Sequence, residues 1–330
     1  MKQRCALMAV ALAVALTGLV WAVAPPAAPE ATGHARPAPQ ASKNLLLAGA
    51  RAGGRLVAVG EYGHVLLSDD NGQSWRQARS VPTVTTLTAL HFINDKQGWA
   101  VGHGGVVIGT GDGGETWNPL AGRLDGKDVL LSVWFGNATQ GLVTGAFGYA
   151  AATADGGKTW KTVPLAAGEE GERHLNHIFA AQNGTLWVAV ESGLLFKSSD
   201  GGRGWQAVTL PYKGSIWGGM QLASGALLVW GMRGNVLRSD DAGKSFQSVA
   251  TGTDQSLGGA VELPDGTLVL AGLGGVVLHS TDGGRRFSAT VRDDRAGLST
   301  VLAGPPGQVV LLGQPGAQLH PVVAGASAPK

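Results

Sequence analysis

Short apolar runs separated by glycine-rich turns recur along most of this chain. The stretch from Gly98 to Trp117 shows the pattern: apolar residues 99–101, a turn at 102–105, a second apolar run at 106–108 and a tight turn that closes on an aromatic residue. Apolar runs of this length between such turns predict β-hairpins in series. Because no segment has the spacing of a long amphipathic helix, we expect very little helix after residue 43.

The second turn of this stretch carries the spacing [ST]-x-D-x-G-x-x-[WF], which we call a box. Six boxes are present, and their Asp residues lie 42, 43, 45, 41 and 41 residues apart, a period typical of solenoid repeats or propeller blades. The box acids are Asp70, Asp112, Asp155, Asp200, Asp241 and Asp282. The aromatic residues that close the boxes are Trp75, Trp117, Trp160, Trp205, Phe246 and Phe287.

Every position of the box has a structural role. The Asp carboxylate can accept hydrogen bonds from N–H groups of its own turn, the Gly can adopt a positive φ, and the Ser or Thr hydroxyl can tie the incoming strand to the turn. The aromatic residue opens the next strand, and its burial between neighbouring units contributes about 2–3 kcal/mol. We therefore interpret the box acids as structural and not catalytic.

The repeats cover about residues 44–324 and form seven units, and in the first six of them three apolar runs are followed by a fourth strand that the box aromatic residue opens. This order predicts an all-β fold, a seven-bladed β-propeller of four-stranded antiparallel blades, with six or eight blades as the alternatives. The seventh unit, residues 297–323, has three runs but no box, because Gln318, Leu319, His320 and Pro321 stand where the box should begin. Either Pro321–Ala324 forms a weak outer strand, or a segment from the N-terminal side completes the ring.

The N-terminus has the features of an export signal. Residues 1–4 carry two positive charges, and an apolar run of 19 residues extends from Ala6 to Ala24. Because such a run can also span a bilayer, cleavage and retention as an inner-membrane anchor both remain open. Either outcome places the rest of the chain outside the cytoplasm, in the periplasm. Residues 25–43 are rich in Pro and Ala and predict a linker, and residues 325–330 form a tail.

Charge and cysteine usage exclude several classes of function. The formal net charge is +2, and no Lys/Arg-rich run is present, so we expect no nucleic-acid partner. Cys5 is the only cysteine and lies before the apolar run. The predicted propeller therefore has no disulfide, no thiolate nucleophile and no cysteine-based metal site.

The repeats resemble the BNR, or Asp-box, propellers, and most closely the photosystem II stability and assembly factor family with its bacterial relatives. The pattern G-W-A-V-G-x-x-G-x-[VI]-x-x-[ST]-x-D-G-G-x-[TS]-W carries the resemblance, which covers about residues 44–324. It implies an exported seven-bladed propeller that acts as a non-catalytic assembly factor for a membrane protein complex. We expect a monomer that binds a protein or a membrane complex and holds no cofactor.

Sialidases also carry Asp boxes, so the alternative is a glycan-directed protein, either a glycoside hydrolase or a carbohydrate-binding propeller. Sialidase chemistry needs three arginines around a substrate carboxylate, a Tyr nucleophile paired with a Glu, and an Asp acid/base. Only three tyrosines are available, and the Arg-Ile-Pro start of sialidases is missing. An enzyme predicts carboxylates or arginines that converge in the central pocket, whereas a scaffold predicts scattered aromatic and charged residues on a broad face.

The predicted binding face is the side opposite the boxes. In a propeller, the turns between second and third strands share one face with the loops that lead to the next blade. Aromatic and charged residues collect in these segments, although turns themselves require only Gly and Asn. The candidate binding residues are Glu61, Tyr62, His103, Phe147, Tyr149, Glu191, Arg233 and Tyr212.

We expect no metal site. The longest loop, Lys161 to His174, contains three glutamates, but it lacks the Asp-x-Asp spacing of a calcium loop. His174 and His177 lie three residues apart at the start of a predicted strand, so their side chains fall on opposite faces of that strand. A shared metal ion is therefore not expected there.

Overall fold

The structure is a computed structural model that describes residues 33–120, 124 and 129–322. The predicted signal or anchor at residues 1–24, the first part of the predicted linker and the predicted tail at 325–330 lie outside these residues. Within the described part, no helix is long and apolar enough to cross a bilayer.

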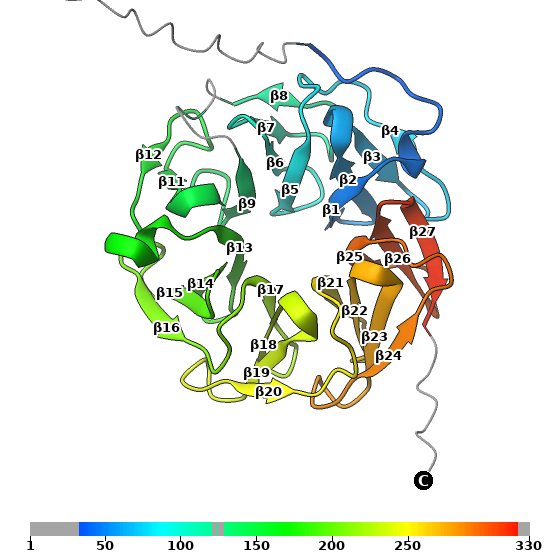
Figure 1. Cartoon of the computed structure of the whole chain (residues 1–330). Coiled ribbons are helices and arrows are strands. Elements are labelled where there is room, and N and C mark those ends of the chain that lie inside the picture. The colour runs from blue at the N-terminus through cyan, green and yellow to red at the C-terminus, as the bar shows by residue number, and fades with distance from the viewer. Residues whose placement is uncertain (1–32, 121–123, 125–128, 323–330) are drawn as a thin grey trace, which may run out of the picture. The chain divides into compact units, whose positions relative to one another are not determined.

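Seven antiparallel sheets form a ring (Figure 1), which confirms the predicted seven-bladed propeller. In each sheet the strands follow one another in chain order. Blade 1 consists of β1 (Leu46–Ala52), β2 (Arg55–Gly60), β3 (Val65–Ser68) and β4 (Arg76–Gln77). Blade 2 consists of β5 (Leu87–Phe92), β6 (Gly98–Gly102), β7 (Val107–Thr110) and β8 (Asn118–Pro119). Blade 3 consists of β9 (Leu130–Phe135), β10 (Gly141–Gly145), β11 (Ala150–Thr153) and β12 (Lys161–Thr162).

The remaining blades continue around the ring in the same way. Blades 4 to 7 consist of β13 (Leu175–Ala180), β14 (Leu186–Val190), β15 (Leu194–Ser198) and β16 (Gln206–Thr209); β17 (Ile216–Gln221), β18 (Leu227–Gly231), β19 (Val236–Ser239) and β20 (Gln247–Val249); β21 (Leu257–Glu262), β22 (Leu268–Gly272), β23 (Val276–Ser280) and β24 (Ser288–Val291); and β25 (Leu298–Ala303), β26 (Gln308–Gly313) and β27 (Gly316–Pro321).

Helical structure in the described residues is confined to 3-10 turns of three to five residues, as expected. These are η1 (Ala41–Lys43), η2 (Glu61–Gly63), η3 (Ala146–Gly148), η4 (Gly168–Glu172), η5 (Met232–Gly234) and η6 (Leu273–Gly275).

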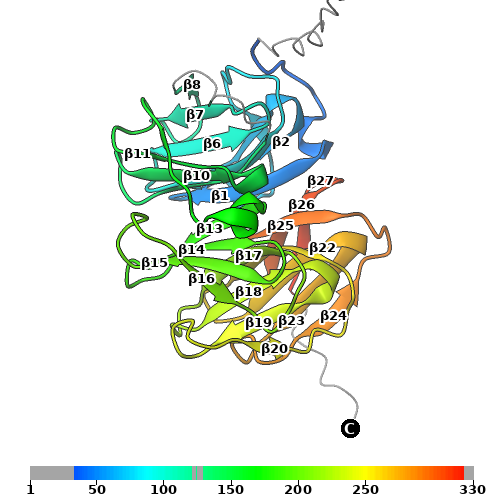
Figure 2. The same cartoon turned by 60° about the vertical axis from the view of Figure 1, so that its left-hand side comes forward.

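The core lies between neighbouring blades, which pack face to face (Figure 2). The second strand of each blade is almost completely buried, because it has a strand on each side and a blade on each face. Trp99 of blade 2 stacks on Phe135 of blade 3 with ring centroids 3.6 Å apart. The fourth strands are short and mostly exposed, so the box aromatic residues cover the outer edges of these cores.

Blade 7 differs from the other six because it has three strands. Pro321, which we expected to open a weak outer strand, is the last residue of the third strand, β27. No described residue forms a fourth strand in this blade. Val310 and Leu312 of β26 pack directly against Leu46 and Leu56 of blade 1. The ring is therefore closed by side-chain packing between blades 1 and 7.

A segment at residues 35–45, which we call the strap, reinforces this junction. The Gln77 side chain on β4 donates to the carbonyl of Arg36 (3.1 Å) and accepts from the N–H of Ala38 (2.7 Å). Ala41 is 3% exposed and packs with residues of both blade 1 and blade 7. The N-terminal side of the chain thus contributes to closure, as one of our alternatives expected, but it adds no strand to blade 7.

Candidate binding face and the opposite box rim

The six boxes form one rim of the propeller, and each is held by its own hydrogen bonds. In blade 3 the Thr153 hydroxyl donates to Asp155 (2.8 Å) and accepts from the N–H of Gly157 (2.9 Å). Thr159 donates to Asp155 twice, from its N–H (2.9 Å) and its hydroxyl (2.6 Å). These bonds, the Thr159 hydroxyl foremost, lower the pKa of Asp155 to about 2. The carboxylate is therefore occupied by its own turn.

The residue four positions after the box Asp also contributes to the hydrogen bonds of the box, although we assigned it no role from the sequence. A hydroxyl at this position donates to the box carboxylate at Ser74, Thr116, Thr159 and Ser245. Blades 4 and 6 have Gly204 and Arg286 there, so only backbone N–H groups reach the acid. The recurrence of Ser or Thr directly before the aromatic residue was the available signal.

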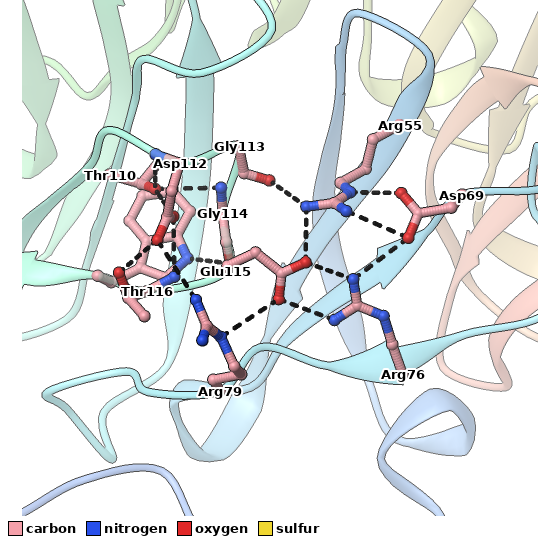
Figure 3. Close-up of polar contacts among 11 residues, drawn as sticks. Arg55, Asp69, Arg76, Arg79, Thr110, Asp112, Gly113, Gly114, Glu115 and Thr116 are labelled. Atoms are coloured by element: carbon pink, nitrogen blue, oxygen red, sulfur yellow. Dashed lines mark hydrogen bonds and ion pairs between the residues drawn. The ribbon is translucent and has the colours of Figure 1, made fainter.

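Three arginines converge on one carboxylate of the box rim (Figure 3). Glu115 lies 2.5 Å from Arg76, 3.0 Å from Arg55 and 3.8 Å from Arg79. The hydrogen bond from Arg76 is the main cause of the lowered pKa of Glu115. A sialidase would offer such a triad to a substrate, but here the carboxylate is the protein's own and joins blade 1 to blade 2.

A cavity of about 360 Å³ lies on the ring axis and is lined by the inner strands of the blades. Its titratable lining residues are His91 and His177, and no described carboxylate or arginine lines it. Burial lowers the pKa of His177 to about 4 and also lowers that of His91. Both imidazoles are therefore neutral at pH 7. The described lining does not contain the converging carboxylates or arginines that a glycosidase requires.

The opposite face is formed by the turns between second and third strands, which we call the turn face. Tyr62, Phe147 and Arg233 occupy the same place in these turns of blades 1, 3 and 5, with φ of 59°, 53° and 55°. Equivalent positions in blades 2 and 6 are Gly104 and Gly274. A non-glycine residue in this left-handed region is strained by about 1–2 kcal/mol. Three large side chains are thus placed where glycine fits without strain.

These side chains point into solvent. Phe147 is 74% exposed and Tyr62 is 59% exposed. The described residues include six exposed large hydrophobic side chains, and four of them lie in the turns of four different blades: Tyr62, Phe147, Met232 and Leu273. Our sequence reading did not select Leu273, because a single leucine before two glycines resembles the end of a strand.

The remaining candidate residues lie at the edge of the turn face or in the core. His103 is exposed, and Tyr212 is half-buried and donates its hydroxyl to the carbonyl of Met232 (3.1 Å). Glu61 accepts a hydrogen bond from the N–H of Leu45 (3.2 Å). These residues border the turn face or fasten its loops.

Tyr149 does not belong to the exposed face. It is 7% exposed and packs with Leu130 and Trp99 between blades 2 and 3. It opens the third strand at the position where blade 1 has the buried His64, so its side chain turns inward after the exposed Phe147. Its predicted role as a binding residue is replaced by a role in the core.

A brace from two neighbouring segments holds Phe147 in place. The Phe147 N–H donates to Nδ1 of His174 (3.1 Å), and the two rings meet edge to face with centroids 4.9 Å apart. Glu191, from the turn of blade 4, accepts from the N–H of His174 (3.1 Å). The described residues contain no group of three or more His, Cys, Asp or Glu side chains suited to a metal ion. His174 and Glu191 therefore act here as supports for an exposed aromatic ring.

Comparison with known proteins finds similarity to assembly-factor propellers. Residues 114–262 match the family model described as photosynthesis system II assembly factor YCF48. Photosystem II assembly protein Ycf48 of Thermosynechococcus vestitus is 41% identical over 132 residues, a region that covers 40% of this chain and 38% of that protein. The matched region thus spans well under half of the relative's length.

Solved structures extend the likeness in fold to most of the ring. A YCF48 bound to a D1 peptide has a TM-score of 0.67 at 19% identity, covering 85% of this chain and 94% of that one. YCF48 from Cyanidioschyzon merolae has a TM-score of 0.66 at 18% identity and covers 88% and 98%. A streptogramin B lyase with a TM-score of 0.71 at 12% identity covers 84% and 94%, so the fold alone does not define an activity. The boxes and the ring identify the chain as an Asp-box β-propeller, and its central residues 114–262 are similar to the Ycf48 assembly factors.

Proposed function

We propose that this protein is a non-catalytic scaffold that binds a protein component of a membrane complex through the turn face and assists its assembly. The observation that carries the proposal is the placement of Tyr62, Phe147 and Arg233 in left-handed turns. Strained backbone positions of this kind cluster at functional and binding sites. Exposed aromatic residues and arginine are also the residue types that contribute most to protein–protein binding.

The relatives support a protein as the partner. One of the similar structures is a YCF48 with a bound D1 peptide, and the matched family model describes a photosystem II assembly factor. The predicted export signal supports a periplasmic location, where the turn face meets the extracytoplasmic side of a membrane complex. The membrane complex is identified by the subunits that bind to the turn face.

The axial cavity gives no support to the glycan-directed alternative. The two histidines among its described lining residues are neutral, and the three arginines that converge on Glu115 are neutralised by Glu115, Asp69 and Asp112. A hydrolase that protonates a leaving group needs a carboxylic acid within reach of the sugar. We therefore propose that this propeller has no hydrolase activity.

The test is a triple variant in which Tyr62, Phe147 and Arg233 are each replaced by Gly. The tagged wild-type chain is cross-linked in isolated membranes, and the proteins attached to it are identified by mass spectrometry. We expect the wild type to attach subunits of one membrane complex, and the triple variant to attach at least tenfold less. The midpoint of thermal unfolding should stay the same or rise, because glycine removes the backbone strain.

Ser192→Gly is the matched control. Ser192 occupies the equivalent position of blade 4 with φ of 59°, but its side chain is small. This variant should attach the same subunits as the wild type. Equal recovery by the wild type and the triple variant would show that the turn face is not the binding surface.

A further inference from the structure

Blade 7 exposes a strand that every other blade covers. The third strands of blades 1 to 6 are almost entirely buried beneath a fourth strand, whereas Leu319 on β27 is 36% exposed and Pro321 is exposed. An uncovered strand edge presents backbone N–H and C=O groups that can pair with another chain. The outer edge of β27 is therefore unlike any other part of the ring.

The complete blades show which groups of β27 are available. In every complete blade, the fourth strand pairs with the two residues that directly precede the box Ser or Thr, and in β27 these positions are Gln318 and Leu319. One position earlier, the carbonyls of Val65, Val107 and Ala150 accept from the outer chain at 2.9–3.0 Å. The equivalent carbonyl is that of Ala317. Among the described residues, no backbone hydrogen bond reaches this side of β27.

The hydrogen bonds between neighbouring blades provide a second observation about the outer edge of β27. In three other junctions, a side chain of one blade donates to the carbonyl of the residue that follows the box Asp of the next blade. Arg55 reaches Gly113 (3.1 Å), Trp99 reaches Gly156 (3.3 Å), and Arg238 reaches Gly283. These bonds link each blade to the corner that precedes the next blade's outer strand.

His279 holds the position of Arg238 in blade 6, but blade 7 has no box for it to reach. His279 is 5% exposed, and neither ring nitrogen has a hydrogen-bond partner among the described residues. Leaving such buried polar atoms unpaired is unfavourable. A polypeptide segment that supplies a carbonyl at the missing corner would satisfy this ring.

The existing outer strands define the chemistry of such a segment. They are two to four residues long and mostly exposed, and in five of the six complete blades the chain at the outer strand contributes an apolar side chain to the core beneath. These apolar residues are Ala78, Leu120, Val163, Val208 and Val249. A segment that fits β27 is therefore extended, polar outward and aliphatic at one inward position.

We propose that the outer edge of β27 is an acceptor site for an extended segment of a partner protein. The segment pairs antiparallel to Gln318 and Leu319 as the fourth strand of blade 7 and presents a backbone carbonyl to His279. This site lies on the outer wall of the ring and does not depend on the turn face. Such strand addition obtains its affinity from main-chain hydrogen bonds and its specificity from alternate side chains.

The chain's own strap does not fill this site in the structure. Ala38 precedes the first strand of blade 1 by eight residues, as Val249 precedes that of blade 6, so Arg36–Ala38 has the length needed to reach β27. Its backbone is instead held on blade 1 by both hydrogen bonds to Gln77. After β27, Val322 replaces the box Asp, so the corner that turns the chain back in other blades is not encoded.

A peptide copied from this chain serves as the probe. Residues 280–291 contain the corner and the outer strand of blade 6, and a fluorescent peptide of this sequence is titrated with the full chain and followed by anisotropy. We expect saturable binding to the wild type. Leu319→Pro removes the outward N–H and should weaken binding at least tenfold, whereas Leu319→Ala should change it by less than about threefold. The nitrogen resonances of the His279 ring should shift on binding.

Ala289→Pro is the matched control for the proline. It places proline in the outer strand of blade 6 at the position where blade 2 has Pro119, and it should bind the peptide like the wild type. The triple glycine variant of the turn face should also bind normally, which separates this site from the proposed function. Absence of binding to the wild type, or equal binding by Leu319→Pro, would overturn the proposal. Binding that appears only in Gln77→Ala, or only after removal of residues 323–330, would assign the edge to the chain itself and also overturn it.

Discussion

The third strands end in two kinds of tight turn, and the two kinds are built differently. At the box end, the polar groups bond to one another, and glycines such as Gly114 and Gly157 adopt the positive φ. At the turn-face end, Phe147 and Tyr62 adopt a similar φ with large exposed side chains. One end is held by its own hydrogen bonds, and the other end places large exposed side chains in a strained backbone conformation.

Left-handed residues other than glycine also occur at the box rim, which sharpens the contrast. Asn71 and Ala242 have φ of 58° at the position after the box Asp. Asn tolerates this conformation well, and Ala has a minimal side chain. Among the described residues, left-handed aromatic side chains occur only in the turn face, whereas a left-handed arginine occurs both there, at Arg233, and in the loop before blade 7, at Arg295.

The largest expected difference between the two ends comes from truncating aromatic residues. Trp117 is 2% exposed in the core beneath its box, so Trp117→Ala should lower the free energy of unfolding by about 3–5 kcal/mol. Phe147→Ala removes a ring that is 74% exposed and should change it by less than about 0.5 kcal/mol. Denaturant unfolding measures both, and similar losses for the two variants would contradict the division of roles.

Removing the carboxylate at the centre of the arginine cluster should have a smaller effect. Glu115→Gln leaves Arg55, Arg76 and Arg79 close together without the negative charge that they share. We expect a loss of about 1–2 kcal/mol at low salt, and a smaller loss in 1 M salt because repulsion between the arginines is screened. Arg79→Ala is the control, since its side chain is 69% exposed. A loss for Glu115→Gln that is independent of salt would argue against an electrostatic role.

The loss of stability at acid pH tests the role of the box carboxylates. The pKa values of Asp70 and Asp155 are lowered to about 2 by hydrogen bonds from Ser74 and Thr159, respectively. Their charged forms therefore stabilise the fold above about pH 4, and this contribution is lost as the pH falls towards 2. Asp155→Asn should melt about 2–4 °C lower at pH 7, with a gap to the wild type that closes at acid pH. A gap that stays constant from pH 7 to pH 2 would exclude the carboxylate as its cause.

The smallest predicted effect is a gain in stability, in contrast to the losses predicted above. Tyr62→Gly relieves a left-handed tyrosine, and we expect the free energy of unfolding to rise by up to about 1 kcal/mol or to remain unchanged. Gly104, at the same place in blade 2, already has this conformation with φ of 64°. A clear loss of stability would show that the Tyr62 ring is structural and would remove it from the binding face.

The blades could be predicted from the sequence because their signals are local. A fixed spacing of four residue types repeated every 41–45 residues specifies each corner, and large residues in glycine-type turns revealed Tyr62 and Phe147. Tyr149 was misassigned because Phe147 lies within the left-handed turn, whereas Tyr149 follows the turn in extended backbone, so the two side chains leave the chain in different directions. The convergence on Glu115 and the contacts of the strap with Gln77 could not be predicted, since both depend on residues far apart in sequence; only the participation of an N-terminal segment in ring closure was anticipated, as one of two alternatives.

Ring closure has a consequence for folding. Six junctions connect blades that follow one another in the chain, but the junction of blades 7 and 1 joins residues such as Arg51 and Ala303, which are 252 positions apart. The entropy of closing so long a loop is concentrated in this one interface. We expect an open arc of blades to form first, and the last slow step to be the meeting of its two ends.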